Sequence, residues 1–382
     1  MRQSVLLSLV AVVALCVLCS NCHSSKPQGS PHATDRVGET VFLQVAQKAA
    51  VPSGESAEPT APNPLLDASF QTTTTKHFVL FHEPGASYVA GACRTLEYAY
   101  ENFYDVFSQA GFDLSRSRDR LVWICFPRKS GFSKYALQAE GMDLSWLDGY
   151  YSTLTNRVAI VQRDQRTRRP EEAVPPSGSG AEAVVAAHRS PQEGVLAMAA
   201  SGQQLDVTRL THEVAHQLSF NSGIQKRGVM YPLWISEGLA TNFEFDGTGS
   251  AVLEHCNAAR RNGLLEVYDA GGLIPLRQFV VQTTVSPDLH LGRRCYAQAW
   301  GFFQFILADH PESLRLYLCR VAKNHADHRD AATMLAEFTD TFGAPEALEG
   351  SWQAFLVRQA QQAAARRSAV SAVPNAGAAG MP

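Results

Sequence analysis

The sequence has little net charge, few cysteines and only one long apolar run. Its 382 residues carry 33 Lys and Arg against 36 Asp and Glu, which gives a net charge of −3. A nearly neutral chain without a long basic block is poorly suited to the phosphate backbone, so we expect no nucleic-acid partner. Eight cysteines are too few for a disulfide-stabilised miniprotein, and a single apolar run excludes a multi-span membrane protein. The 45% of hydrophobic residues is typical of a globular protein.

The apolar run lies at the N-terminus and indicates a targeting segment. Arg2 precedes Val5–Leu18, a run that is shorter than the roughly 20 residues of a membrane span and typical of a secretory signal. Three closely spaced cysteines end the segment, but none follows the small residue that a lipoprotein signal places before its modified cysteine. We predict a signal peptide at 1–22 and an exported protein, periplasmic or extracellular. A lipid anchor would be its only link to a membrane, and an uncleaved anchor is the alternative.

Composition divides the rest of the chain into three parts. Residues 23–66 are rich in Ser, Pro, Gly and Ala and predict a disordered linker. Residues 67–360 carry the apolar patterns of one folded domain, interrupted by a polar insertion at 163–203. Residues 361–382 are rich in alanine and polar side chains, and we predict a disordered tail.

The apolar patterns of the domain predict an α+β fold, in which a small N-terminal β-sheet with helices precedes a mostly helical C-terminal part. Strands are expected at 77–82 and 121–126, with a long amphipathic helix between them that ends near Gly111. Residues 149–161 predict two short strands joined by a turn at Thr155-Asn156.

The strongest chemical signal is His212-Glu213-Val214-Ala215-His216, an HExxH motif. On a helix, positions i and i+4 share one face about 6 Å apart, so two imidazoles there can reach one metal ion. Glu213 would lie beside the open position of that metal, where it can take a proton from water. The alternative is an exposed polar helix face with two incidental histidines.

A third ligand is expected downstream, because a catalytic zinc site uses three protein ligands and one open position. Glu237 lies in Trp234-Ile235-Ser236-Glu237-Gly238-Leu239-Ala240, at the start of a helix that begins near Pro232. Its neighbours are apolar, and a carboxylate in such surroundings needs a partner such as a cation. An ordinary first-turn glutamate, favoured by the helix dipole, is the alternative.

These two motifs resemble those of the gluzincin zinc metallopeptidases. THEVAHQLSFNSG together with LWISEGLA is most similar to an uncharacterised family of exported bacterial proteins with a peptidase-MA-like domain, over about 70–358. The resemblance implies a zincin-like fold, a Zn²⁺ ion held by His212, His216 and Glu237, and Glu213 as the general base. Peptide hydrolysis is implied for the wider group.

The resemblance also implies a group that stabilises the oxyanion. Tyr296 follows Glu237 at an interval close to that of the aminopeptidase branch, with His290 as the second candidate. Tyr296 also begins an apolar helix face, so a packing role is an equal alternative. The GxMEN segment of that branch is absent from this sequence, and we therefore do not predict an aminopeptidase. Residues 156–162 could form either a substrate-pairing edge strand or an ordinary core strand.

Residues after Glu237 are candidates for orienting the imidazoles, namely Thr241, Asn242 and Glu244. Helix capping and solvation would explain them equally well. The overall hypothesis is an exported zinc metallopeptidase-like hydrolase that acts on a peptide or protein substrate. The alternatives are a catalytically silent zincin-like domain that binds peptide or envelope polymer, and a scaffold without metal.

Overall fold

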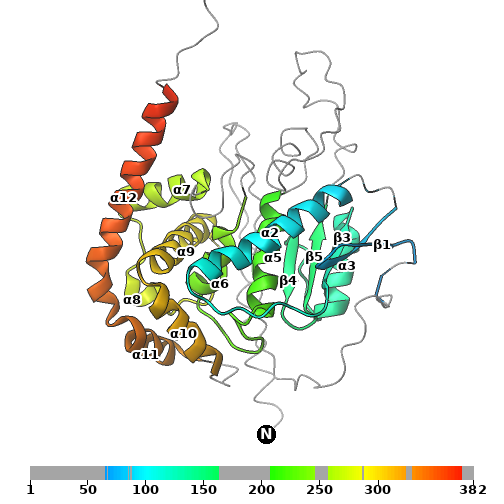
Figure 1. Cartoon of the computed structure of the whole chain (residues 1–382), viewed down its shortest axis with the longest axis horizontal. Coiled ribbons are helices and arrows are strands. Elements are labelled where there is room, and N and C mark those ends of the chain that lie inside the picture. The colour runs from blue at the N-terminus through cyan, green and yellow to red at the C-terminus, as the bar shows by residue number, and fades with distance from the viewer. Residues whose placement is uncertain are drawn as a thin grey trace, which may run out of the picture. The chain divides into compact units, whose positions relative to one another are not determined.

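A computed structural model shows a five-stranded sheet followed by a group of helices (Figure 1). The predicted signal peptide, almost all of the predicted linker and the predicted insertion at 163–203 lie outside the residues that it describes. Those residues are 65–162 except 67, 85 and 87, and 207–245, 257–285, 288–323 and 329–371.

The sheet is mixed and has the strand order β1-β2-β3-β5-β4. Strands β2, β3 and β5 are parallel to one another, whereas β1 and β4 pair antiparallel at the two edges. The strands are β1 Gln71–Thr74, β2 Phe78–His82, β3 Leu121–Phe126, β4 Gly149–Ser152 and β5 Arg157–Val161.

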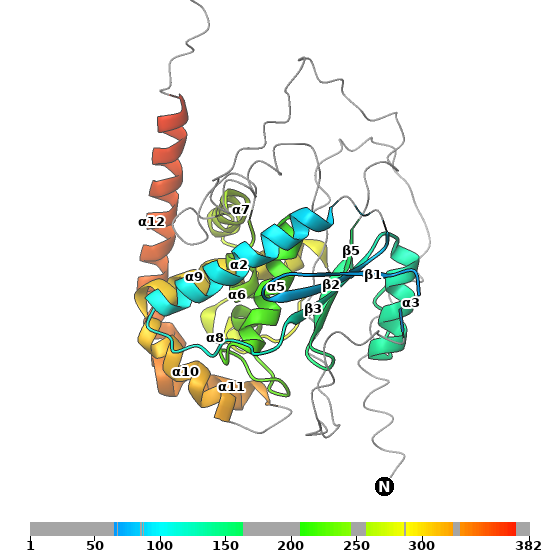
Figure 2. The same ribbon diagram turned by 45° about the vertical axis from the view of Figure 1, so that its right-hand side comes forward.

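Helices cover both faces of the sheet, which explains why β2 and β3 are apolar and buried along their whole length. On one face, Phe78 and Trp123 belong to a core shared with α2 (Val89–Gln109) and α5 (Val207–Asn221). On the other face, a second core is formed with α3 (Lys129–Glu140). Figures 1 and 2 show this three-layer arrangement from two directions.

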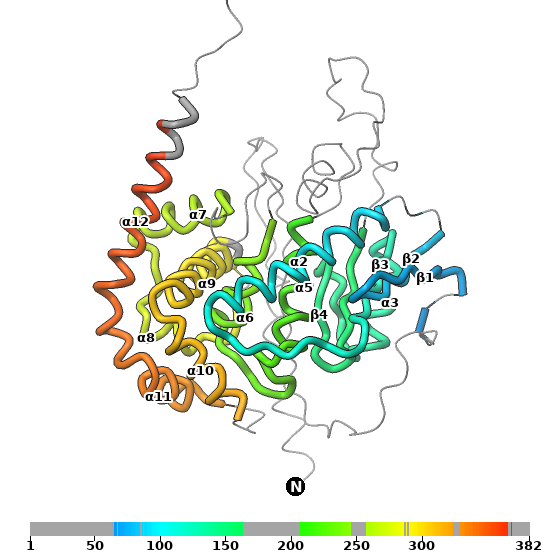
Figure 3. Tube along the Cα trace, in the orientation of Figure 1, coloured from blue at the N-terminus to red at the C-terminus, as the bar shows by residue number. Residues whose placement is uncertain are grey.

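The C-terminal part is helical and continues the core that α2 and α5 share. Helix α6 is buried on all sides and packs along α9, while α12 runs along the outer side of α7, α8 and α9 (Figure 3). These helices are α6 Leu233–Asn242, α7 Ala258–Asp269, α8 Leu276–Phe279, α9 Leu289–Asp309, α10 Pro311–Lys323, α11 Ala331–Phe342 and α12 Pro345–Ser371.

The α+β fold class and the predicted strands are confirmed, including the two strands on either side of Asn156, which adopts a positive φ of 55°. The edge-strand alternative for 156–162 is wrong, because β5 lies between β3 and β4 and is therefore a core strand. The strand at the edge is β4. Among the described residues, no helix combines the length and the apolar character of a membrane span.

The predicted disordered tail needs one correction. Helix α12 continues to Ser371, so the prediction of disorder is wrong for 361–371. The stretch is rich in Ala, Gln and Arg, which have high intrinsic helix propensity. The prediction of disorder considers only its low hydrophobicity and not this propensity. Residues 372–382 lie outside the described part of the chain.

Candidate metal centre

Helix α5 carries the HExxH motif and is fixed to the sheet by buried polar contacts. The Trp123 indole N–H on β3 donates to Gln217 Oε1 at 2.8 Å, and Gln217 Nε2 donates to the backbone oxygen of Asn156 at 3.2 Å. Asn156 and Asn221 also exchange side-chain hydrogen bonds at 3.0 and 2.8 Å. Since buried polar groups must find partners, these bonds define how α5 is rotated against the sheet.

Helix α6 brings Glu237 to the same place through an unusually close contact with α9. The helix begins after Pro232, whose extended backbone makes it the N-cap residue. A β-carbon on Gly238 would lie only 2.6 Å from the backbone oxygen of Ala299, so only glycine permits this approach. Asn242 Nδ2 bridges the two helices by donating to the Trp300 oxygen at 2.8 Å. The glycine after Glu237 therefore has a packing role.

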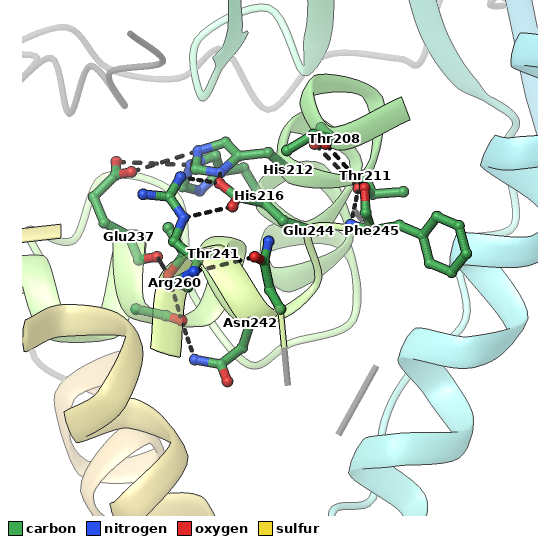
Figure 4. A network of polar contacts seen from close by, with 12 residues as sticks. Thr208, Thr211, His212, His216, Glu237, Thr241, Asn242, Glu244, Phe245 and Arg260 are labelled. Carbon is green, nitrogen blue, oxygen red and sulfur yellow. Dashed lines mark hydrogen bonds and ion pairs between the residues drawn. The ribbon is translucent and has the colours of Figure 1, made fainter. Parts of the chain in front are cut away.

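The side chains of His212, His216 and Glu237 converge in the interior. His212 Nε2 lies 3.2 Å from His216 Nε2 and 3.5 Å from Glu237 Oε2, and His216 Nε2 lies 3.7 Å from Glu237 Oε1. All three side chains are at most 1% exposed. Their ligand atoms lie within 4.8 Å of one another, so this group could hold one metal ion. Figure 4 shows the three side chains facing one another.

The close packing of these groups shifts their pKa values in opposite directions. Burial lowers the pKa of His212, but hydrogen bonds to Glu237 and Glu244 outweigh it and raise the pKa to about 10. Burial, together with the charge on His212, lowers the pKa of His216 well below its ordinary value. One imidazole is thus stabilised as a cation and the other as the neutral form when no ion is bound.

Glu213 is buried beside the cluster and against strand β4. Its side chain is 1% exposed, and Oε1 accepts no hydrogen bond within the part of the chain that the structure describes. Burial raises the pKa of Glu213 to about 7, with the charge on His212 opposing the shift and that on Glu237 adding to it. A β-carbon on Gly149 of β4 would lie 3.4 Å from Glu213 Oε1, so this glycine leaves space beside the carboxylate.

Glu244 lies just beyond α6 and bonds directly to a candidate ligand. His212 Nδ1 lies 2.9 Å from Glu244 Oε1, so Nδ1 donates to this carboxylate, and Nε2 is the nitrogen that could bind an ion in the neutral ring. Arg260 of α7 donates to both oxygens of Glu244, at 2.7 and 2.6 Å. Burial alone would raise the pKa of Glu244, but Arg260 and His212 hold it below its ordinary value.

Two threonines of α5 hold the segment that carries Glu244. Thr211 Oγ1 accepts from the backbone N–H of Phe245 at 2.9 Å, and Thr208 Oγ1 donates to the Phe245 oxygen at 2.9 Å. Both the backbone N–H and the backbone oxygen of Phe245 are therefore bonded to α5, next to His212 (Figure 4). We call Thr208 and Thr211 the threonine clamp.

The remaining predicted residues have mixed outcomes. Tyr296 lies on α9, near the charges of Glu237 and Glu213. Burial is the main cause that raises the pKa of its hydroxyl well above the ordinary value, and the two carboxylates add to the shift. His290 is exposed at the start of α9, outside the cluster. Thr241 and Asn242 bond to backbone oxygens rather than to the imidazoles, so their predicted orienting role is wrong.

Sequence reasoning missed Gly149 and Arg260. Gly149 carries no local signal, because its importance depends on the approach of a helix from far along the chain. Arg260 carries a local signal, because it lies in the first turn of α7, where the helix dipole disfavours a cation. A residue that breaks a local preference points to a compensating interaction elsewhere, here with Glu244.

One protein family matches part of the chain. It is described as "Protein of unknown function (DUF1570)", and the match covers residues 206–326. This range contains the HExxH motif, Glu237, Glu244, Arg260 and Tyr296. A search of the curated proteins finds none that matches the chain.

Proposed function

We propose that the protein is a zinc-dependent hydrolase that cleaves peptide bonds, similar to the gluzincin metallopeptidases. The observation that carries the proposal is the convergence of His212, His216 and Glu237 from two helices, with Glu213 beside them. Two imidazole nitrogens and one carboxylate oxygen are a known ligand set of catalytic zinc, which leaves one position for water or substrate.

The distances between the ligand atoms support zinc. Ligands at about 2.0–2.1 Å in a tetrahedral arrangement lie about 3.3 Å from one another. The nearest separations of the three groups are 3.2, 3.5 and 3.7 Å, so little movement is needed. The buried Glu213 Oε1, which lacks a hydrogen bond among the described residues, also fits a site that receives water or substrate.

The positions of these side chains support the following chemistry. When bound, zinc polarises a carbonyl group and makes water more acidic. Glu213 accepts the proton of the attacking water and delivers it to the leaving amine. The Tyr296 hydroxyl, on α9, donates a hydrogen bond to the former carbonyl oxygen as its negative charge develops. We further propose that the protein acts after export, on peptide or protein substrates.

Three measurements test this proposal. Purified protein should contain about one equivalent of zinc by elemental analysis, and it should cleave a peptide library in a reaction that a chelator abolishes. The Glu213→Gln variant should keep the zinc and lose turnover, because the amide cannot accept the proton. His290→Gln, an exposed residue outside the cluster, is the matched control and should cleave normally. Undiminished cleavage by Glu213→Gln would contradict the proposal.

A further inference from the structure

Arg260 connects helix α7 to the candidate metal ligand His212 through a single carboxylate. Its Nε and one terminal nitrogen donate to Glu244 Oε2 and Oε1 at 2.7 and 2.6 Å. The same Oε1 accepts from His212 Nδ1 at 2.9 Å. The three side chains form a continuous series of contacts from α7 to α5 (Figure 4).

The geometry of the Arg260–Glu244 pair fixes the direction of the carboxylate. A guanidinium group that donates to both oxygens sets the plane of the carboxylate as well as its position, which a lysine cannot do. The Glu244 side chain is only 3% exposed and that of Arg260 is 23% exposed, so water screens the pair weakly. The acceptor offered to His212 therefore has a defined direction.

The position of Arg260 along the chain is locally unfavourable. Asn257 caps α7 by accepting from the Arg260 backbone N–H at 3.1 Å, which places the arginine in the first helical turn. A cation there opposes the helix dipole. The contact with Glu244 offsets this cost and also places the guanidinium carbon 5.9 Å from the centre of the Tyr296 ring. Arg260 thus bonds to Glu244 and also lies close to the proposed oxyanion donor.

We propose that Arg260 is a positioning residue that raises the affinity of the site for zinc. It acts through Glu244, which fixes the tautomer and the ring orientation of His212. The inference rests on the metal site of the proposed function. A purely structural ion pair would change the free energy of unfolding and leave the zinc affinity unchanged.

The test measures the zinc dissociation constant of the full chain by competition with a chromophoric chelator at fixed pH. Arg260→Met should weaken zinc binding roughly 10- to 100-fold, because loss of a group that orients a metal-binding side chain typically has an effect of this size. Arg260→Lys keeps the charge and protects the fold, but it loses the paired contact, so binding should still weaken. Glu244→Gln should weaken binding too, and adding Arg260→Met to it should cause little further loss, because the arginine acts through Glu244.

The chain offers a matched control in a second buried pair, Arg329 with Glu337. Arg329→Met should lower the free energy of unfolding and keep the zinc affinity of the wild type. Wild-type zinc affinity in both Arg260 variants would overturn this inference and leave the proposed function intact. A wild-type chain that binds no zinc would overturn both. Zinc binding that weakens in Arg260→Met, in a chain that cleaves no peptide, would support the inference and contradict the proposed hydrolase.

Discussion

Gly238 lies directly against the backbone of Ala299, so close that a β-carbon on Gly238 would be 2.6 Å from the Ala299 oxygen. The contact joins α6 to α9 one residue after Glu237, and it allows the helix that carries Glu237 to pack closely on α9. A glycine that makes no polar side-chain contact thus takes part in placing the helix that carries the third candidate ligand.

Replacing this glycine should separate the two helices. We expect Gly238→Ala to lower the free energy of unfolding by about 1–3 kcal/mol, because the backbone oxygen cannot move out of the way as a flexible side chain would. Glu237 should shift with α6, and bound zinc should fall in elemental analysis. Gly263→Ala is the control, because nothing lies within 4 Å of its β-carbon position, and it should keep or slightly increase stability.

A substitution at Gly149 should affect catalysis without removing the metal. A β-carbon there would lie 3.2 Å from Arg209 Cδ and 3.4 Å from Glu213 Oε1, but none of the three nearest atoms belongs to a proposed ligand. We expect Gly149→Ala to keep its zinc and to lower kcat for any peptide that the wild type cleaves. Loss of zinc together with activity would show that the strand positions the ligands instead.

The threonine clamp should contribute to both stability and zinc binding. Thr211→Val keeps the shape of the side chain but leaves the Phe245 N–H without its acceptor, which should cost about 1–3 kcal/mol in chemical denaturation. Since Phe245 follows Glu244, the zinc affinity should fall as well. Thr341→Val removes only a bond to its own helix, at Glu337 O, and should leave zinc affinity unchanged.

Removal of zinc should lower the thermal stability of the protein. A ligand that binds only the folded state at about 1,000 times its dissociation constant contributes about 4 kcal/mol. A chelator should therefore lower Tm in the wild type, and added zinc should restore it. His216→Ala lacks one proposed ligand, so its Tm should respond little to either treatment. Identical melting curves for the wild type with and without chelator would contradict the metal site.

Glu97 provides a pH dependence that is independent of the metal centre. Its carboxylate accepts from Thr75 Oγ1 at 2.5 Å and from the His77 backbone N–H at 2.8 Å. Burial alone would raise the pKa of Glu97, but these bonds, together with the bond and the charge of the His77 imidazole, outweigh it and hold the pKa below the ordinary 4.5. A lowered pKa stabilises the fold above about pH 4.5, and this contribution is lost as the pH falls further.

We therefore expect Glu97→Gln to be less stable than the wild type at pH 7, by about 1 kcal/mol for this half-buried group. The difference should shrink in urea unfolding experiments below pH 4.5. Glu312→Gln is the control, because that carboxylate is on the surface and its pair with Arg315 should add little at any pH. A difference for Glu97→Gln that persists at pH 3 would show that packing, not charge, explains it.

Much of the fold could be predicted from local patterns. The continuous apolar run of β3 indicates a strand that is covered on both faces, and the apolar spacing along α2 indicates a helix with one buried side. The order of the strands could not be obtained in this way. Whether β4 or β5 forms the edge depends on pairing between strands, and both are buried.

The sequence by itself determined the candidate ligands, because the i and i+4 spacing of His212 and His216 already places two imidazoles on one helix face. Only the tertiary structure decided that Glu237 reaches them, that Glu244 bonds to His212, and that Arg260 bonds to Glu244. The physical reason is the range of the interactions. Helical periodicity acts over a few residues, whereas the approach of α6 to α9 and the ion pair from α7 depend on contacts between segments that are far apart along the chain.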